Sequence, residues 1–256
     1  MLKVTGVVAV GALAIGAGVL SQAGTAKTSR IADGQGGLLI SPLRVDRQAV
    51  TGATDRITIA NRSPEALTIE VKARPWSVSS SGDVAPNRRS TLGGVRVSEG
   101  AFTLAPNQTR EVDVALAGAP AGGSLYGALE VVGLPTDLEQ RKGVVTGYRL
   151  VGALRYHAAT KRYALSASSP KVSKDQLLLP VRSTGNTNAA VRATVEVKGA
   201  TGTRRGSARA AILPGKRVSL NVLSAKTLRA GRYTVKATLR QGTLRTTVTK
   251  TLRVKR

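Results

Sequence analysis

Hydrophobic and polar positions alternate along most of the chain. In residues 57–61 and 67–74, nearly every other position is isoleucine, leucine or valine, and most of the residues between them are polar. The same alternation returns at residues 112–116 and 148–156. Because successive side chains of a strand point to opposite faces, a period of two predicts half-buried antiparallel strands.

The C-terminal part repeats this pattern with more basic polar positions. Valine and alanine alternate with polar residues over residues 191–198, and similar patterns occupy residues 232–240 and 244–254. Lys250 interrupts the last of these stretches and predicts a β-bulge. Since most basic residues take the polar positions, we expect them to form a surface and not to disturb the core.

The spacing of strands and turns predicts an all-β fold. We expect two tandem immunoglobulin-like β-sandwiches, the first over residues 36–157 and a basic one over residues 160–256. A tyrosine corner, in which a tyrosine hydroxyl bonds the backbone a few residues upstream, is expected at Tyr233, with a looser version at Tyr126.

Helical signals are few. One short helix is expected at Thr136-Asp137-Leu138-Glu139, where a threonine and a glutamate have the spacing of a capping box. Gly143 offers a place for this helix to stop. The helix would interrupt an otherwise strand-rich sequence.

The N-terminal segment differs from the rest. An apolar run over residues 4–20 follows Lys3, and small residues come after it. This order predicts a secretory signal peptide over residues 1–26, cleaved near Ala23 or Ala26, with an uncleaved membrane anchor as the alternative. Either way we expect an exported, extracellular or envelope-associated chain, which meets a membrane only through this segment if it stays uncleaved.

The chain is strongly basic, and the charge is uneven. Of 256 residues, 39 are Lys or Arg and 14 are Asp or Glu, a net charge of +25. Residues 161–256 hold 22 basic and two acidic side chains, so this part alone carries +20. Such a step in charge predicts that the two halves meet different partners.

The basic sandwich favours an anionic partner from the cell envelope. Nucleic acid is not expected, because base stacking needs exposed aromatic residues and Tyr163 and Tyr233 both fall on inward positions. Anionic cell-wall polymers or peptidoglycan fit an exported chain, and another surface protein is a further candidate partner. The alternative is that the basic face only sets solubility. The predicted polyanion-binding set is Arg192, Lys198, Arg204, Arg205, Arg209, Lys216, Arg217, Arg232, Lys236, Arg240, Arg245 and Arg253.

Catalytic and metal-binding constellations are not found. There is no cysteine, and the single histidine, His157, has no recognisable nucleophile motif to serve. Ser168-Ser169-Pro170-Lys171 matches a Ser-x-x-Lys string without its companion motifs. Glu111 and Asp113 share one strand face but offer too few oxygen ligands for Ca²⁺. We therefore expect a protein that is not an enzyme and uses no cofactor or metal.

The first sandwich carries motifs of known families. It opens with Ile40-Ser41-Pro42-Leu43-Arg44-Val45, continues with an Asn61-Arg62-Ser63 turn between strands, and later has a Gly-containing strand around Gly127-Ala128-Leu129-Glu130. In this it resembles the N-terminal domain of PapD-like pilus chaperones, and it is also similar to the peptidoglycan-binding immunoglobulin-like domain of WxL-interacting proteins. The second sandwich resembles generic bacterial immunoglobulin-like surface modules.

The chaperone resemblance implies a specific site. Those chaperones anchor a subunit's terminal carboxylate between an Arg on the first strand and a Lys on the last strand, and donate the last strand to the subunit. Arg44 falls at the Arg position and is the candidate carboxylate anchor, whereas the Lys position falls near Ala153. The strand face with Arg149 and Arg155 is also more charged than an apolar groove would accept.

These features lead to one main prediction and one alternative. The main prediction is an exported, non-enzymatic cell-envelope binding protein, whose first sandwich contacts peptide or peptidoglycan and whose basic second sandwich contacts anionic envelope polymers. The alternative is a pilus or surface-protein assembly chaperone of the PapD-like type. The two differ in whether the first sandwich binds a wall polymer or a strand of another protein.

Overall fold

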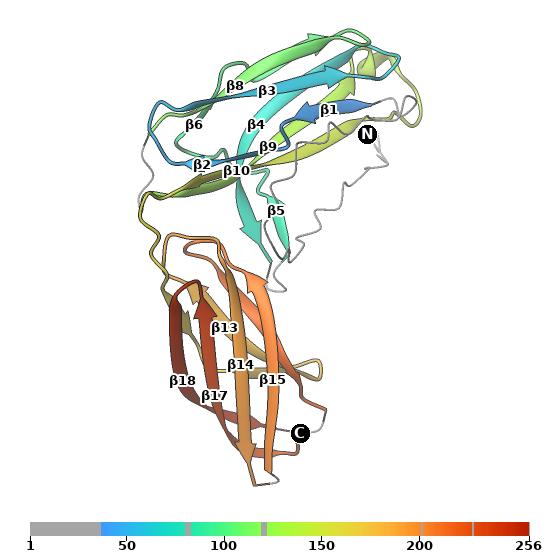
Figure 1. Ribbon diagram of the computed structural model, residues 1–256. Coiled ribbons are helices and arrows are strands. Elements are labelled where there is room, and N and C mark those ends of the chain that lie inside the picture. Colours follow the sequence, from blue (N-terminus) through green and yellow to red (C-terminus); the bar gives the residue numbers. More distant parts are fainter. Residues whose placement is uncertain (1–36, 80–82, 119–121, 201, 227, 256) are drawn as a thin grey trace, which may run out of the picture.

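Nearly all of the regular secondary structure consists of strands (Figure 1). The computed structural model describes residues 37–79, 83–118, 122–200, 202–226 and 228–255. The predicted signal peptide or anchor, residues 1–26, lies outside this range. Within the described ranges no helix is long and apolar enough to cross a membrane. The predicted all-β class is confirmed.

The first sandwich consists of two packed sheets. Its strands are β1 (Leu38–Ser41), β2 (Arg44–Gln48), β3 (Thr54–Asn61), β4 (Leu67–Val78), β5 (Val84–Pro86), β6 (Val95–Val97), β7 (Ala101–Leu104), β8 (Thr109–Leu116), β9 (Leu125–Pro135) and β10 (Tyr148–His157). One sheet has the order β1-β3-β8-β6, and the other has the order β2-β10-β9-β4-β5, with β7 paired to β4.

The alternating residues fill the space between these sheets. Ile57 and Ile59 of β3 pack with Leu67 and Ile69 of β4 and with Val131 of β9, all almost fully buried. The first strand segment changes sheet around a cis peptide bond before Pro42, because β1 pairs antiparallel with β3 whereas β2 pairs parallel with β10. This change of sheet leaves β10 only partly covered by β2.

The buried side chain of Asn61 holds the turn after β3 by hydrogen bonds. Its Nδ2 donates to the carbonyl oxygens of Glu65 (2.8 Å), Leu104 (3.0 Å) and Ala105 (3.2 Å), while its Oδ1 accepts from the Ser63 amide and hydroxyl. Both Asn61 and Ser63 are buried. The Asn-x-Ser motif is therefore a structural tie between the two sheets, and every polar atom of the asparagine side chain is satisfied.

The second sandwich has its own core. Its strands are β11 (Leu165–Ala167), β12 (Lys171–Ser173), β13 (Gln176–Ser183), β14 (Ala190–Gly199), β15 (Gly202–Ala211), β16 (Arg217–Ser224), β17 (Gly231–Gln241) and β18 (Leu244–Val254). β11, β12 and β16 pair with β13 in one sheet, and the other sheet has the order β15-β14-β17-β18. Their inward residues form a cluster separate from that of the first sandwich.

The tyrosine corner predicted at Tyr233 is confirmed. Its hydroxyl donates to the backbone oxygen of Arg229 at 2.9 Å, four residues upstream. The ring packs against Gly199, where a Cβ atom would lie 2.4 Å from two ring carbons. Gly199 therefore supplies the space that this corner needs.

Three local predictions are wrong. The expected helix is only a single 3₁₀ turn, η1 (Leu138–Gln140), without a side-chain cap bond. Lys250 marks no bulge, because β17 and β18 pair without interruption; a shift in register lies instead between Leu177 and Leu178 of β13. The Tyr126 hydroxyl contacts His157 Nδ1 at 3.1 Å and makes no tyrosine corner.

Candidate functional site

The outward side of the β2-β10-β9-β4 part of the first sandwich carries a set of charged residues. We call this surface the outer face. Strand register places Arg74, Ala128, Ala153 and Arg44 in one row across β4, β9, β10 and β2. Two arginines therefore flank two alanines. Since neighbouring strands are about 4.8 Å apart, the Cα atoms of the two arginines lie roughly 14 Å from each other.

Asp46 contacts several basic side chains at the β2 side of the outer face. Its carboxylate contacts Arg44 Nε at 3.5 Å, Arg155 Nη1 at 3.6 Å and His157 Nε2 at 2.6 Å. His157 also contacts Tyr126, whose pKa is raised chiefly by burial. Both ring nitrogens of His157 are therefore engaged, and the histidine bridges β2 and β9.

The predicted carboxylate anchor, Arg44, lies exposed on this face. Its side chain is 59% accessible, and its contact with Asp46 is long. Directly opposite it on β10 is Ala153, as the resemblance to the chaperones implies. Arg44 therefore has free donors but no cation facing it, and its role stays a prediction.

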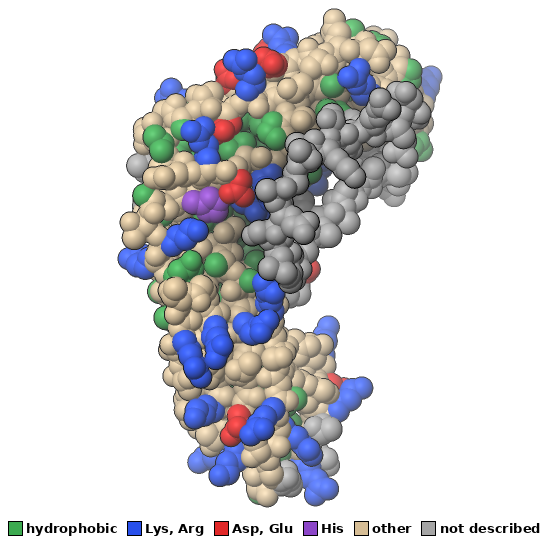
Figure 2. All heavy atoms as spheres, viewed as in Figure 1, with side chains coloured by type: hydrophobic (Ala, Val, Ile, Leu, Met, Phe, Trp, Pro, Cys, Tyr) green, Lys and Arg blue, Asp and Glu red, His purple; other side chains and the backbone are tan. Residues whose placement is uncertain are grey.

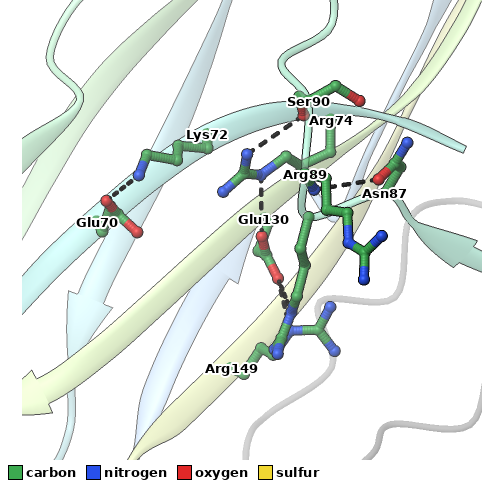
Figure 3. Close-up of polar contacts among 9 residues, drawn as sticks. Glu70, Lys72, Arg74, Asn87, Arg89, Ser90, Glu130 and Arg149 are labelled. Carbon is green, nitrogen blue, oxygen red and sulfur yellow. Dashed lines mark hydrogen bonds and ion pairs between the residues drawn. The ribbon is translucent and has the colours of Figure 1, made fainter.

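Glu130 lies at the centre of a second cluster, which the sequence did not reveal (Figure 3). Its carboxylate is only 4% exposed and accepts from the Nε atoms of Arg149 (2.7 Å), Arg88 (3.1 Å) and Arg74 (3.2 Å). Burial acts to raise the pKa of Glu130, but the three guanidinium groups outweigh it and the pKa is lowered. One carboxylate shared by three arginines leaves two positive charges in excess.

Much of the donor capacity of this cluster faces solvent. A guanidinium carries five N–H donors, and Arg88 and Arg149 each use only Nε in these bonds. Arg88 is 62% exposed and Arg149 is 25% exposed. Arg74 is more enclosed and also donates to the Ser90 backbone oxygen. The exposed nitrogens are suited to a carboxylate or another anion.

An open sheet edge runs beside these charges. β2 pairs with residues 153–157 of β10, so residues 148–152 have no hydrogen-bonded strand on that side within the described part of the chain. The Ala153 amide donates to Leu43 and the His157 oxygen accepts from Ala49, both on the β2 side. By alternation, the N–H and C=O groups of Arg149 and Val151 point to the same side and lack a strand partner there.

The predicted polyanion-binding residues do not share one surface. Nine of them lie on the outward face of the β15-β14-β17-β18 sheet: Arg192, Lys198, Arg205, Arg209, Arg232, Lys236, Arg240, Arg245 and Arg253. Arg204 is opposite the buried Val197 and belongs to the other side of that sheet. Arg217 begins β16 in the other sheet and Lys216 precedes it, so these three residues are not brought together with the nine.

The other candidate motifs take ordinary structural places. Glu111 and Asp113 both form ion pairs with Arg56, at 3.2 and 3.5 Å. Ser168 precedes β12, and its amide donates to the Pro180 oxygen. Among the described residues no group of three His, Cys, Asp or Glu side chains is placed to hold a metal ion.

Comparison with solved structures identifies the fold. A chain from the chaperone–tip adhesin complex of CFA/I fimbriae is similar, with a TM-score of 0.52, 12% identity, and coverage of 84% of this chain and 98% of that chain. The fold is PapD-like. The sequence resemblance is thereby confirmed at the level of the fold, and the similarity extends beyond the first sandwich.

Other solved structures give lower scores. The class 5 fimbriae chaperone CfaA has a TM-score of 0.45 and 14% identity, with coverage of 86% of this chain and 100% of that one. The CsuC–CsuE chaperone–tip subunit complex of Acinetobacter baumannii gives 0.46 and 11%, with coverage of 85% and 99%. No protein-family profile and no curated protein sequence matches the chain.

Proposed function

We propose that the chain is an exported, non-enzymatic assembly chaperone that holds an extended segment of a surface protein along the open edge of β10. The observation that carries this proposal is the unpaired segment 148–152, set beside exposed arginines in a PapD-like fold. The earlier alternative thus becomes the preferred function. The predicted contact of the first sandwich with peptidoglycan receives no support from the comparisons.

The direction of the bound segment follows from β2. This strand runs parallel to β10 and begins at Arg44, opposite Ala153. A partner strand that runs parallel to β10 along residues 148–152 would be in line with β2 and would end close to Arg44. Its terminal carboxylate would then meet the exposed Arg44 guanidinium, which forms charge-assisted hydrogen bonds with such a group.

The side chains of the outer face set the chemistry of the partner. Arg149, Val151 and Arg155 point outward along β10, and Val151 is the apolar one of the three. We expect a segment with acidic or small residues beside the arginines, not one made of large apolar residues. Main-chain bonds give affinity in strand addition, and alternate side chains give specificity. Covering an exposed edge also protects the partner from aggregation.

The test uses the full-length protein, tagged and purified from the envelope of the cells that produce it. We expect a surface protein to co-purify, and to be lost when its own C-terminal residues are removed. Val151→Pro removes an edge N–H without touching the β9 ladder, so it should abolish the complex, whereas Val151→Ala should keep it. Retention of the partner by Val151→Pro, or the absence of any co-purifying protein, contradicts the proposal.

A second pair of variants tests the carboxylate anchor. Arg44→Gln should weaken the complex about tenfold, because one charge-assisted bond is lost. Arg96→Gln is the matched control, since Arg96 is an exposed arginine of β6 in the other sheet. Equal weakening by both variants would show that only net charge matters and would remove Arg44 from the site.

A further inference from the structure

Four arginines form a straight row across the second sandwich. Strand register places Arg209 of β15 opposite Arg192 of β14, Arg192 opposite Arg240 of β17, and Arg240 opposite Arg245 of β18. All four are exposed. We call this set the arginine row.

The row lies in a field that is almost entirely basic. The acid on the same face is Glu196, which pairs with Arg205 at 3.3 Å. Within the described residues, no member of the arginine row forms an ion pair. Figure 2 shows Lys and Arg side chains spread over the lower part of the molecule, where β14, β15, β17 and β18 face the viewer in Figure 1.

Such a row is unfavourable for the folded chain by itself. Like charges directly opposite each other on neighbouring strands destabilise a sheet, and here three such pairs follow one another. The strands are about 4.8 Å apart, so the repulsion acts well within the screening distance in physiological salt, which is about 8 Å. An anionic ligand laid along the row would relieve every pair at once.

The rows beside it extend the same chemistry. The next outward row consists of hydroxyl residues, Ser207, Thr194, Thr238 and Thr247, which offer hydrogen-bond donors. Beyond it come Arg205 and Lys236, and further along Arg232 stands opposite Arg253. The face therefore combines guanidinium groups with hydroxyl groups, and its strands present no aromatic residue outward.

We propose that this face binds a linear polymer of phosphate groups laid across the four strands along the arginine row. Arginine outnumbers lysine among the nine cations of the face, and the planar guanidinium matches phosphate with two parallel bonds. Nucleic acid is disfavoured because bases would find no aromatic side chain to stack on. The ligand is therefore a free polyphosphate chain or a phosphate-containing wall polymer, which share this chemistry.

The test is binding of long-chain inorganic polyphosphate to the full-length protein at several salt concentrations. Arg192→Gln with Arg240→Gln removes the centre of the row. Arg182→Gln with Arg217→Gln is a matched control, because these two exposed arginines are also opposite each other, but on β13 and β16 of the other sheet. Both double variants lose two positive charges.

We expect the row variant to weaken polyphosphate binding at least about tenfold and to reduce the salt slope by roughly 1.4 to 1.8, while the control changes binding less than about twofold. Equal losses in both variants would overturn the proposal, because net charge would then explain binding. Equal affinity for polyglutamate, or for DNA of the same charge, would also overturn it. If a phosphate-containing wall polymer displaces polyphosphate and its dephosphorylated form does not, the wall polymer is assigned as the source of the phosphate groups.

Discussion

Arg44 and Ala153 lie directly opposite each other on the parallel strands β2 and β10. The chaperone resemblance implies a lysine at the position of Ala153, so the carboxylate site here has one cation where two would be expected. The next residue in the same row is Ala128, and the other cation of that row, Arg74, is tied to Glu130, while Arg155 in the neighbouring row shares Asp46 with Arg44. A single substitution at Ala153 can therefore add the second cation and raise the affinity of this site for a carboxylate.

Ala153→Lys should strengthen binding of the co-purified surface protein. The new ammonium group would stand beside Arg44 and add a charge-assisted bond to the terminal carboxylate, which corresponds to about a tenfold lower Kd. Calorimetric titration measures this, with Ala153→Gln as the uncharged control of similar size. If the two variants bind alike, the carboxylate is not held at this row.

Glu130→Gln should destabilise the first sandwich. The substitution leaves Arg74, Arg88 and Arg149 around a neutral amide, and we expect a loss of about 2–3 kcal/mol at neutral pH, because part of the cluster is solvated. Denaturant unfolding measures the difference. Glu139→Gln is the control, since Glu139 is exposed and forms no ion pair within the described residues.

The same variant predicts a pH dependence. The pKa of Glu130 in the folded chain lies below the ordinary value of 4.5, so its contribution is present above that pH and is lost as the pH falls through the folded pKa. The stability difference between the wild type and Glu130→Gln should therefore shrink below about pH 4.5. A difference that stays constant down to pH 2 would show that the arginines do not stabilise the ionised carboxylate.

Asn61→Ala should cost about 3–5 kcal/mol, since it leaves the carbonyl oxygens of Leu104 and Ala105 and the Ser63 amide without their partner inside the sandwich. Asn221→Ala, an exposed asparagine of β16, should change stability by less than about 0.5 kcal/mol. Thermal unfolding of both variants tests this tie. Similar melting temperatures would contradict its structural role.

Arg192→Gln with Arg240→Gln should stabilise the second sandwich at low salt. Removing the two central charges leaves no arginine pair directly opposed in the row, for a gain of roughly 0.5–1 kcal/mol. The gain should fade as salt rises, because these exposed charges are screened. Melting curves at 10 mM and 500 mM NaCl check this, and a gain that is absent at low salt would show that the row carries no repulsion.

The sequence predicted those features that depend on alternation alone. Outward and inward positions of β4, β10, β14 and β17 follow from the period of two, and the Tyr233 corner follows from a local motif. The Glu130 cluster could not be predicted, because its arginines are 56, 42 and 19 residues away along the chain and meet only through strand order. The one sequence feature that points to this cluster is the acidic residue Glu130 within the otherwise apolar residues 128–132.

Register explains the other surprises. Alternation placed Arg192, Arg240 and Arg245 outward, but it could not show that they lie opposite one another and Arg209, because that depends on how four strands are aligned. The expected helix at residues 136–139 was wrong for a local reason. The backbone is already extended at Arg141 (φ −83°, ψ 138°), so the helix ends after a single 3₁₀ turn, and Arg141 there binds Asp137 and Glu65.

The open edge of β10 is tested most directly by amide hydrogen exchange, read residue by residue over 149–152. In the free protein the amides of Arg149 and Val151 should exchange fast, while those of Leu150 and Gly152, which face β9, should be protected. Adding the partner should protect Arg149 and Val151 as well. If these two amides keep their fast exchange in the complex, the partner does not bind as a strand along β10.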